Sequence, residues 1–470
     1  MKLTFLGACR QVTGSAYLLE QDSLRVLVDC GLYQERPFLE RNWNQFPADP
    51  QTIDALILTH VHLDHSGLIP KLVRDGFNGP IFMTPITADL LPIVLLDSAH
   101  LQEEDAAFKR KRHKKEGRQG PYPEIPLYTE EDVRRVKPLI REVNYGQPIK
   151  FSQNFSCLLH NAGHILGSAM VEIILGRGKR EKHIVFTGDL GQKDKPLVDD
   201  PEFLQAAETL IMEATYGDRN HEDPADIETL LTKIINETVA AGGNIVIPTF
   251  AVERAQEVLY YLGQLTREEK IPPLLCFLDS PMALEVTQVF ERHRESLDEE
   301  TRRLYHLHQD PFSFPGLKLV RSIEESKAIN HLRGSCLIMA GSGMGTGGRI
   351  KHHLVHNISR PESTILFVGY QAPGTLGRQI LDGHPEVRIF GQMYPVRSRI
   401  EQIQGFSAHA DRRFLLEWLA SFQQPPRQIF LTHGEEEALA AFRQSLLDKF
   451  SASFSPSVFI PAYKETYQLV

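Results

Sequence analysis

The chain has 470 residues, of which 42% are hydrophobic and 24% are charged, the balance of an ordinary globular protein with a full core. No apolar run reaches the roughly 20 residues that a membrane span requires, and the five scattered cysteines form no CxxC pair, which argues against a disulfide framework and favours a reducing cytoplasm. The formal net charge is −9, whereas nucleic-acid-binding proteins are typically basic. Bound metal ions would add positive charge that this count omits.

The first half of the chain predicts short strands separated by turns. Residues 1–7 indicate a strand rather than a signal peptide, which would need a basic start and a longer apolar stretch. Apolar, β-branched runs predict further strands at residues 24–28, 53–58 and 184–186.

Residues 109–115, KRKRHKK, form the most basic stretch of the chain and precede a segment rich in glycine and proline. The favoured interpretation is a solvated helix end followed by a loop. A rim that attracts phosphate groups is the alternative. Residues 291–308 form a charged, helix-prone connector with no recognisable chemistry.

The pattern changes between about residues 220 and 399, where strand–helix units recur with Gly-rich turns. Histidines with acidic neighbours lie mostly outside this block, which predicts an inserted domain flanked by metal chemistry. The whole chain is therefore expected to be an α/β protein of packed layers. Strands are predicted at 244–248, 274–278, 335–340 and 364–368, and helices at 251–262, 282–290, 415–420 and 436–447.

The most specific signal is the run HVHLDH at residues 60–65, directly after a predicted buried strand. Alternate residues at the end of a strand point the same way, so His60 and His62 can bind one ion. Asp64 and His65 follow a turn and can face a second ion. Imidazole nitrogens and carboxylate oxygens are the usual non-thiolate ligands of zinc. The run therefore predicts the centre of a two-zinc hydrolase site.

Four single residues near glycines could complete this site. Asp29, Asp189 and His433 each follow a predicted strand, and His164 lies in the segment NAGHILGS. Alone, each would more often be a capping or turn residue. Their shared position favours a role at the site, because open sheets gather ligand sites at strand ends.

The ordered series of Asp29, HxHxDH, His164 and Asp189 resembles the four motifs of the metallo-β-lactamase superfamily. Residues 212–217 (MEATYG), 405–411 (GFSAHAD) and 431–435 (LTHGE) resemble motifs A, B and C of the β-CASP nucleases. The resemblance runs nearly from end to end, and it is greatest to prokaryotic relatives of the eukaryotic pre-mRNA 3′-end cleavage endonuclease.

This resemblance implies a four-layer αββα metallo-β-lactamase fold with an inserted α/β β-CASP domain. The metallo-β-lactamase parts would be residues 1–217 and 400–470, and the inserted domain would be residues 218–399. The resemblance also implies two zinc ions per chain. One would be held by His60, His62 and His164, the other by Asp64, His65 and His433, with Asp189 bridging them and Asp29 orienting a ligand histidine.

A two-zinc site would activate water for attack on a phosphodiester. His409 is the candidate for protonating the departing ribose oxygen, because Glu213 would keep it in its acid form. A residue that only begins a helix is the alternative for His409. The expected product ends are 5′-phosphate and 3′-hydroxyl.

The Gly-rich run at residues 341–348 satisfies GxGxxG, but it lacks the acidic residue of a dinucleotide fold and the lysine of a Walker A loop. A backbone nest for an anion fits better. In the family, the segment Gly341, Ser342, Gly343 and Met344 contacts substrate phosphate. Arg378 is expected to be a further phosphate contact, although a surface arginine is the default.

Histidine in motif C goes with the RNA-directed members of the family, so we expect a ribonuclease acting on single-stranded RNA in the cytoplasm, without a membrane partner. A DNA-directed enzyme, a small-substrate hydrolase such as a thioesterase, and a catalytically silent RNA-binding scaffold are the alternatives. No KH module is expected in front of the first strand, and no RNase J-type domain at the end. Endonuclease or exonuclease mode, RNA preference, physiological target and oligomeric state, a homodimer included, stay open.

Overall fold

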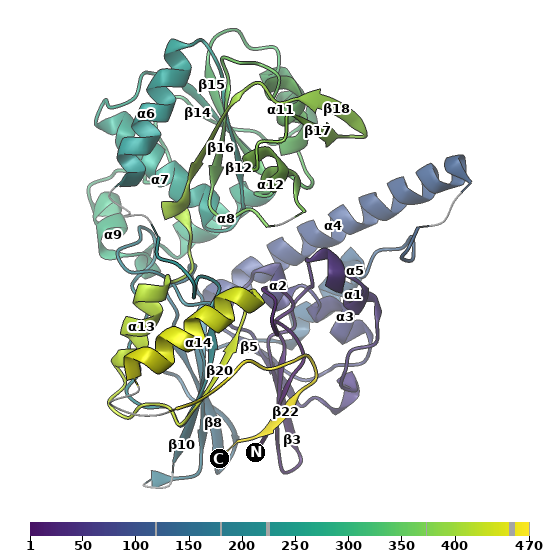
Figure 1. The fold of residues 1–470 in the computed structure, drawn as a ribbon, viewed down its shortest axis with the longest axis vertical. Coiled ribbons are helices and arrows are strands. Elements are labelled where there is room, and N and C mark those ends of the chain that lie inside the picture. Colours follow the sequence, from purple (N-terminus) through teal and green to yellow (C-terminus); the bar gives the residue numbers. More distant parts are fainter. Residues whose placement is uncertain (118–119, 179–180, 222–225, 373, 451–455, 470) are drawn as a thin grey trace. The chain divides into compact units, whose positions relative to one another are not determined.

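The computed structural model describes residues 1–117, 120–178, 181–221, 226–372, 374–450 and 456–469 (Figure 1). The chain forms two compact units. Unit 1 comprises Met1–Asp194, Asp200–Asn220 and Ala408–Val470, and unit 2 comprises Lys195–Asp199 and His221–Ser407. Each unit combines sheets with helices, so the predicted α/β class is confirmed.

Unit 1 contains a first seven-stranded sheet in the order β22-β1-β2-β3-β4-β5-β6. β22, β1, β2 and β3 pair antiparallel, whereas β3, β4, β5 and β6 run parallel. The carboxyl ends of β3 and β4 therefore open at the same edge. The strands are β1 (Lys2–Phe5), β2 (Tyr17–Gln21), β3 (Leu24–Val28), β4 (Ala55–Ile57), β5 (Ile81–Met83), β6 (Ile140–Glu142) and β22 (Thr466–Gln468).

The second seven-stranded sheet has the order β21-β20-β11-β10-β9-β8-β7. β10, β11, β20 and β21 are parallel, and β7 to β10 are antiparallel. The strands are β7 (Ile149–Ser152), β8 (Phe155–Asn161), β9 (Ala169–Leu175), β10 (Lys182–Phe186), β11 (Thr209–Glu213), β20 (Gln428–Thr432) and β21 (Ser457–Phe459).

Alternating side chains bury both faces of the second sheet, because successive residues of a strand point to opposite faces. Ile184 and Phe186 share a core with Val26 and Val28 of the first sheet. Val185 faces the other way, into a core that contains the fully buried Trp418. That core is covered by α13 (Arg412–Ala420) and α14 (Glu436–Phe450).

Further helices lie beside the first sheet of unit 1, which completes the predicted four-layer αββα arrangement (Figure 1). None of the helices in the described part of the chain is both long and apolar enough to cross a lipid bilayer. The helices and short 3-10 turns are η1 (Arg36–Phe38), α1 (Glu40–Trp43), η2 (Pro50–Thr52), α2 (Leu63–Ser66), α3 (Ile69–Arg74), α4 (Pro85–Glu116), α5 (Glu130–Val136) and η3 (Lys137–Leu139).

Unit 2 is built on a parallel six-stranded sheet in the order β14-β13-β15-β12-β16-β19, with a separate hairpin, β17-β18. The strands are β12 (Ile245–Thr249), β13 (Leu275–Asp279), β14 (Leu317–Leu319), β15 (Cys336–Gly341), β16 (Thr364–Val368), β17 (Glu386–Ile389), β18 (Gln392–Pro395) and β19 (Arg399–Ile403). The helices are α6 (Asp226–Ala240), α7 (Arg254–Arg267), α8 (Pro281–Arg292), η5 (Arg294–Ser296), α9 (Glu299–His306), α10 (Ile323–Ile329), α11 (Ile350–Asn357), α12 (Leu376–Leu381) and η6 (Gln404–Phe406).

Candidate metal centre

The predicted metal ligands lie together in unit 1, at the carboxyl ends of strands from both sheets. His60 follows β4, Asp189 follows β10 and His433 follows β20, while His164 comes from the connection between β8 and β9. Parallel strands open their carboxyl ends at one edge, so residues far apart in the chain meet there.

Two glycines let the loops that carry these residues approach closely. A Cβ atom added at Gly31 would lie 1.7 Å from the carbonyl oxygen of Asp64, and one at Gly191 would lie 1.8 Å from that of Gly163. Any side chain at either position would therefore push apart two loops of the site.

A first donor cluster consists of His60, His62, His164 and Asp189, whose ligand atoms all lie within 4.8 Å of one another. The Nδ1 atom of His62 is 3.1 Å from Nε2 of His60 and 3.3 Å from Nε2 of His164. The carboxylate oxygen Oδ2 of Asp189 lies 3.4 Å from His60 and 3.5 Å from His164. Three imidazoles and a carboxylate at these distances match the donor set of zinc.

A second donor cluster consists of Asp64, His65 and His433. The Nε2 atoms of the two histidines are 3.2 Å apart, and Oδ2 of Asp64 lies 3.4 Å from His433. The other carboxylate oxygen of Asp189, Oδ1, is 3.2 Å from His65 and 3.5 Å from His433. Each oxygen of Asp189 thus faces a different cluster.

The protonation states of the first cluster favour metal binding. Burial lowers the pKa of His60 and His164 well below 6.5, and lowers that of His62 to about 4. These three imidazoles are therefore neutral at pH 7, the form in which histidine binds a metal. The donor set and its charge state together fit a metal cofactor.

Asp29 supports the second cluster from behind. Its carboxylate is fully buried, with Oδ2 2.7 Å from Nδ1 of His65, the ring nitrogen that faces away from the second cluster. Thr59 donates two hydrogen bonds to the same carboxylate, from its backbone N–H at 2.8 Å and from its hydroxyl at 2.9 Å. This arrangement fixes the orientation of His65 and presents Nε2 toward Asp189 and His433.

The substitution Asp29→Asn should weaken metal binding without removing a donor atom from either cluster. An amide is a poorer acceptor than a carboxylate and leaves the His65 ring less well oriented, so we expect a loss of about 10–100-fold in affinity for one of the ions. A calorimetric titration of the metal-free protein with zinc would measure this loss of affinity. Asp54→Asn at the protein surface is the control, and equal affinities for both variants would contradict the assigned role.

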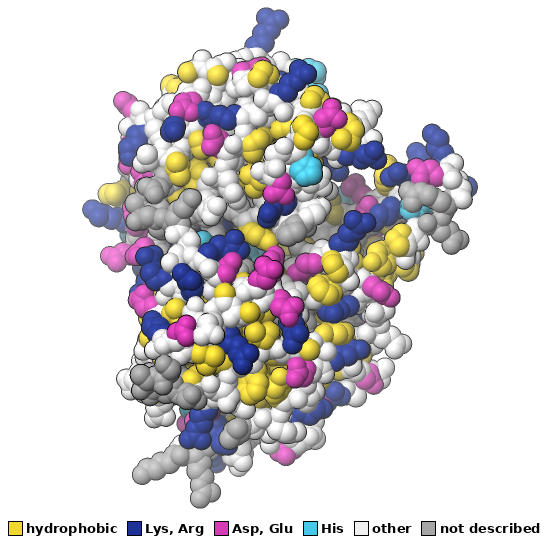
Figure 2. Space-filling model, in the orientation of Figure 1, with side chains coloured by type: hydrophobic (Ala, Val, Ile, Leu, Met, Phe, Trp, Pro, Cys, Tyr) yellow, Lys and Arg dark blue, Asp and Glu magenta, His cyan; other side chains and the backbone are white. Residues whose placement is uncertain are grey.

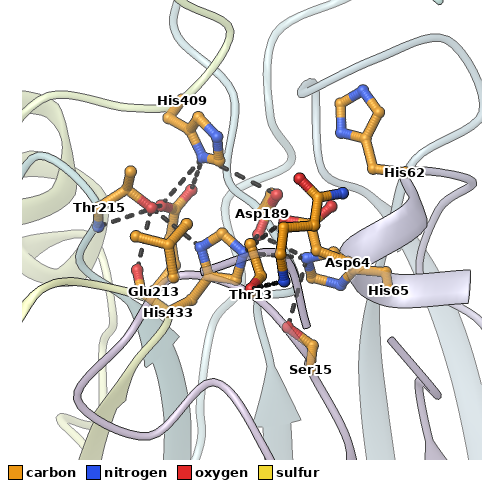
Figure 3. Close-up of polar contacts among 12 residues, drawn as sticks. Thr13, Ser15, His62, Asp64, His65, Asp189, Glu213, Thr215, His409 and His433 are labelled. Carbon is orange, nitrogen blue, oxygen red and sulfur yellow. Dashed lines mark hydrogen bonds and ion pairs between the residues drawn. The ribbon is translucent and has the colours of Figure 1, made fainter. Parts of the chain in front are cut away.

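The pair formed by Glu213 and His409 lies beside the metal ligands, also in unit 1. Nδ1 of His409 is 3.2 Å from both carboxylate oxygens of Glu213 and 3.9 Å from Oδ2 of Asp189 (Figure 3). Although burial lowers the pKa of His409, the carboxylates of Glu213 and Asp189 raise it to about 9. The imidazole therefore carries a proton near neutral pH.

Thr215 is a residue of the site whose role the sequence did not indicate. Its hydroxyl oxygen lies 2.6 Å from Oε2 of Glu213, 2.9 Å from the backbone carbonyl oxygen of His433 and 3.0 Å from Nδ1 of His433. It thus joins the Glu213–His409 pair to the second cluster. Its position two residues after Glu213 was visible, but the contact with His433 spans 218 residues and depends on the pairing of β11 with β20.

The predicted phosphate contacts lie in unit 2. The segment from Gly341 to Met344 begins at the last residue of β15. The Met344 carbonyl accepts a hydrogen bond from the Gly377 backbone at 3.0 Å, next to Arg378. The structure therefore brings the two predicted segments together. Arg378 forms an exposed ion pair with Asp382, 2.8 Å away, so its role as a phosphate contact stays a prediction.

Three protein families match successive parts of the chain. Residues 9–236 match the metallo-beta-lactamase superfamily, residues 255–380 the Beta-Casp domain, and residues 393–457 the Zn-dependent metallo-hydrolase RNA specificity domain.

Similar proteins span nearly the whole chain. Ribonuclease TTHA0252 of Thermus thermophilus is 39% identical over 95% of this chain and 96% of its own length. The transcription termination factor FttA of Methanosarcina mazei is 35% identical over 96% of this chain and 69% of its own length, and that of Methanocaldococcus jannaschii is 32% identical over 95% and 69%.

Among solved structures, a protein of unknown function from Enterococcus faecalis shares the fold, with a TM-score of 0.55 over 99% of both chains at 12% identity. The ordered family matches and the end-to-end similarity to a ribonuclease agree with the layered fold and its His/Asp site. The chain belongs to the β-CASP nucleases of the metallo-β-lactamase superfamily, among the prokaryotic relatives of the pre-mRNA 3′-end cleavage endonuclease.

Proposed function

We propose that this chain is a zinc-dependent ribonuclease that hydrolyses phosphodiester bonds of single-stranded RNA and leaves 5′-phosphate and 3′-hydroxyl ends. One observation carries the proposal: two donor clusters share the carboxylate of Asp189 and lie beside a histidine–carboxylate pair. The similarity to a ribonuclease over 95% of the chain supports RNA as the substrate.

The metal cofactor is assigned as two zinc ions. His60, His62 and His164 would hold one, Asp64, His65 and His433 the other, and Asp189 would touch both. When bound, zinc supplies Lewis acidity that activates water and neutralises charge on a phosphodiester. The mixture of imidazole and carboxylate donors, with no thiolate among the described residues within reach, favours zinc over softer metals.

The protein supplies the remaining chemistry through its own side chains. His409 donates a proton to the departing ribose oxygen, and Glu213 holds the His409 ring by Nδ1, so that Nε2 is the atom that carries the transferred proton. Glu213 is itself fixed by the Leu190 backbone N–H, which donates at 2.6 Å, and by Thr215. A fully buried carboxylate with this many donors is rigidly positioned.

The rest of the chain is assigned on the same basis. Residues 218–399 form the inserted β-CASP domain, and residues 1–217 and 400–470 form the metallo-β-lactamase domain. The segment from Gly341 to Met344 and Arg378 contact substrate phosphates. The five free cysteines are all buried and unpaired with one another, which fits a protein of the reducing cytoplasm.

The purified protein should cleave single-stranded RNA, and chelators should abolish the cleavage, because the proposed mechanism depends on bound metal. Gel analysis of linear and circular RNAs with labelled nucleotides would measure this, since only an endonuclease opens a circle. A single-stranded DNA of the same sequence and a thioester substrate are the controls. Hydrolysis of the thioester without cleavage of RNA would refute the proposal.

A further inference from the structure

The longest helix of unit 1, α4, begins at the edge of the metal centre and leads away from it. The hydroxyls of Thr84 and Thr87, at its first turn, donate at 2.7 and 2.9 Å to the carbonyl of Gly167, three residues after His164. The helix has 32 residues, so it is about 48 Å long at 1.5 Å per residue. Its cationic segment starts at Lys109, roughly 36 Å from its first residue.

The cations at the far end of α4 are only partly neutralised. Lys109 is paired with Asp105 at 2.6 Å, and Arg112 with Glu116 at 2.7 Å. Lys111, Lys114 and Lys115 are exposed and have no acidic partner in the described part of the chain. Figure 2 shows Lys and Arg side chains gathered at this end of the helix.

The unpaired lysines share one face of α4 with an exposed aromatic ring. Phe108, Lys111 and Lys115 are spaced i, i+3 and i+7 along the helix. Lys114 lies three residues after Lys111, so the four side chains form one stripe. Phe108 is 64% exposed. The face that carries His113 is the packed one, because His113 is buried against Glu124. Arg110 donates to the Glu124 carbonyl at 2.9 Å.

Stabilisation of the helix explains only part of this pattern. Cations in the last turn interact favourably with the helix dipole, and Gly117 caps the helix in a left-handed conformation with φ of 63°. Lys111 precedes the last turn, and neither effect calls for an exposed phenylalanine. The acidic residues Glu103, Glu104 and Asp105 come before Phe108, and Glu116 alone follows it within α4, so most of the negative charge is separated from the positive charge along the helix.

We propose that the stripe of Phe108, Lys111, Lys114 and Lys115 is a binding surface for single-stranded RNA, outside the catalytic centre. The lysines would contact phosphates and the ring would stack on a base, the combination used by proteins that hold single strands without sequence preference. At about 3.4 Å per stacked nucleotide, this surface holds the strand some ten nucleotides from the scissile bond. The inference rests on the proposed ribonuclease function.

The test compares the kcat/KM values of long and short RNAs. In a triple variant, Lys111→Gln, Lys114→Gln and Lys115→Gln, kcat/KM for an RNA of about 30 nucleotides should fall roughly tenfold to a hundredfold at about 0.1 M salt. The slope of log kcat/KM against log salt concentration should become shallower by about 2, because each lost phosphate contact contributes about 0.7 to that slope. An RNA of about six nucleotides cannot span the distance, so its cleavage should be unchanged. Phe108→Leu should lower kcat/KM for the long RNA about fivefold by removing the stacking plane.

A matched control removes three exposed cations from another part of unit 1: Arg134→Gln, Arg135→Gln and Lys137→Gln. This variant should behave as the wild type on both RNAs, because two of its cations are already paired with acidic residues. Equal kcat/KM values for the wild type and the triple lysine variant on the long RNA would overturn the inference. An equal loss of kcat/KM on both RNAs would overturn it as well. A wild type that cleaves neither RNA would instead refute the proposed function.

Discussion

Asp189→Asn should abolish most turnover and lower the zinc content of the protein. Asp189 faces both donor clusters, with Oδ2 toward His60 and His164 and Oδ1 toward His65 and His433. An amide replaces one ligand oxygen by nitrogen and removes a negative charge from a fully buried site. The loss of metal catalysis is worth several kcal/mol, or on the order of 10³-fold in rate.

Elemental analysis of the purified variant, together with kcat on single-stranded RNA, would measure both effects. His433→Ala offers a comparison within the same site, because it removes a donor from the second cluster alone and should lower the zinc content toward one ion per chain. Asp218→Asn, on an exposed loop, controls for the change of charge. Two zinc ions retained in the Asp189→Asn protein would rule out the bridging role.

His409→Ala should lose turnover while keeping its zinc. His409 contacts Glu213 at 3.2 Å and lies 3.9 Å from Asp189. Both residues of the pair also belong, with Asp189 and His433, to a third group of possible metal donors, so the proposed role of His409 in proton transfer needs a direct test. Loss of a general acid typically costs 10²–10⁴-fold in rate, and kcat should fall within about this range.

Zinc content is the measurement that separates this role from that of a ligand. If zinc is lost together with activity, His409 is a ligand and its assignment as general acid is wrong. Glu213→Gln should give the same result with a smaller loss, because the amide still accepts the hydrogen bond of the Leu190 backbone but no longer stabilises a charged imidazole. His306→Ala, on the exposed surface of α9, is the control.

Strands with strong apolar patterns could be predicted from the sequence. β3 and β16 have the predicted bounds, residues 24–28 and 364–368, because β16 is a continuous run of buried side chains and β3 ends in the buried run Val26, Leu27 and Val28. The HVHLDH run and the residues after β10 and β20 were recognisable for a similar reason, since polar residues directly after a buried strand stand out. The structure brings all seven predicted ligands into two adjacent clusters, and their roles as ligands stay predictions.

Features that depend on distant pairing could not be predicted. β22 is a short, half-polar strand that forms by pairing with β1. The paired residues Thr4 and Thr466 are 462 positions apart in the sequence. The start of α7 was predicted too early, at residue 251. The backbone of Glu253 is left-handed, with a φ of 67°, so this residue cannot belong to the right-handed helix. α7 therefore begins at Arg254. Nothing in the local pattern of residues 251–253 indicates this left-handed conformation.

The spread of the site along the chain has a consequence for protein synthesis. Its donors range from His60 to His433, and Thr215 and Glu213 connect to the last of them. At about 5–20 residues per second, roughly 20–90 seconds of translation separate the first residue from His433. A growing chain therefore has neither a complete second cluster nor His409 until synthesis is nearly finished, and under the proposed mechanism it could not cut the messenger that is being read before then.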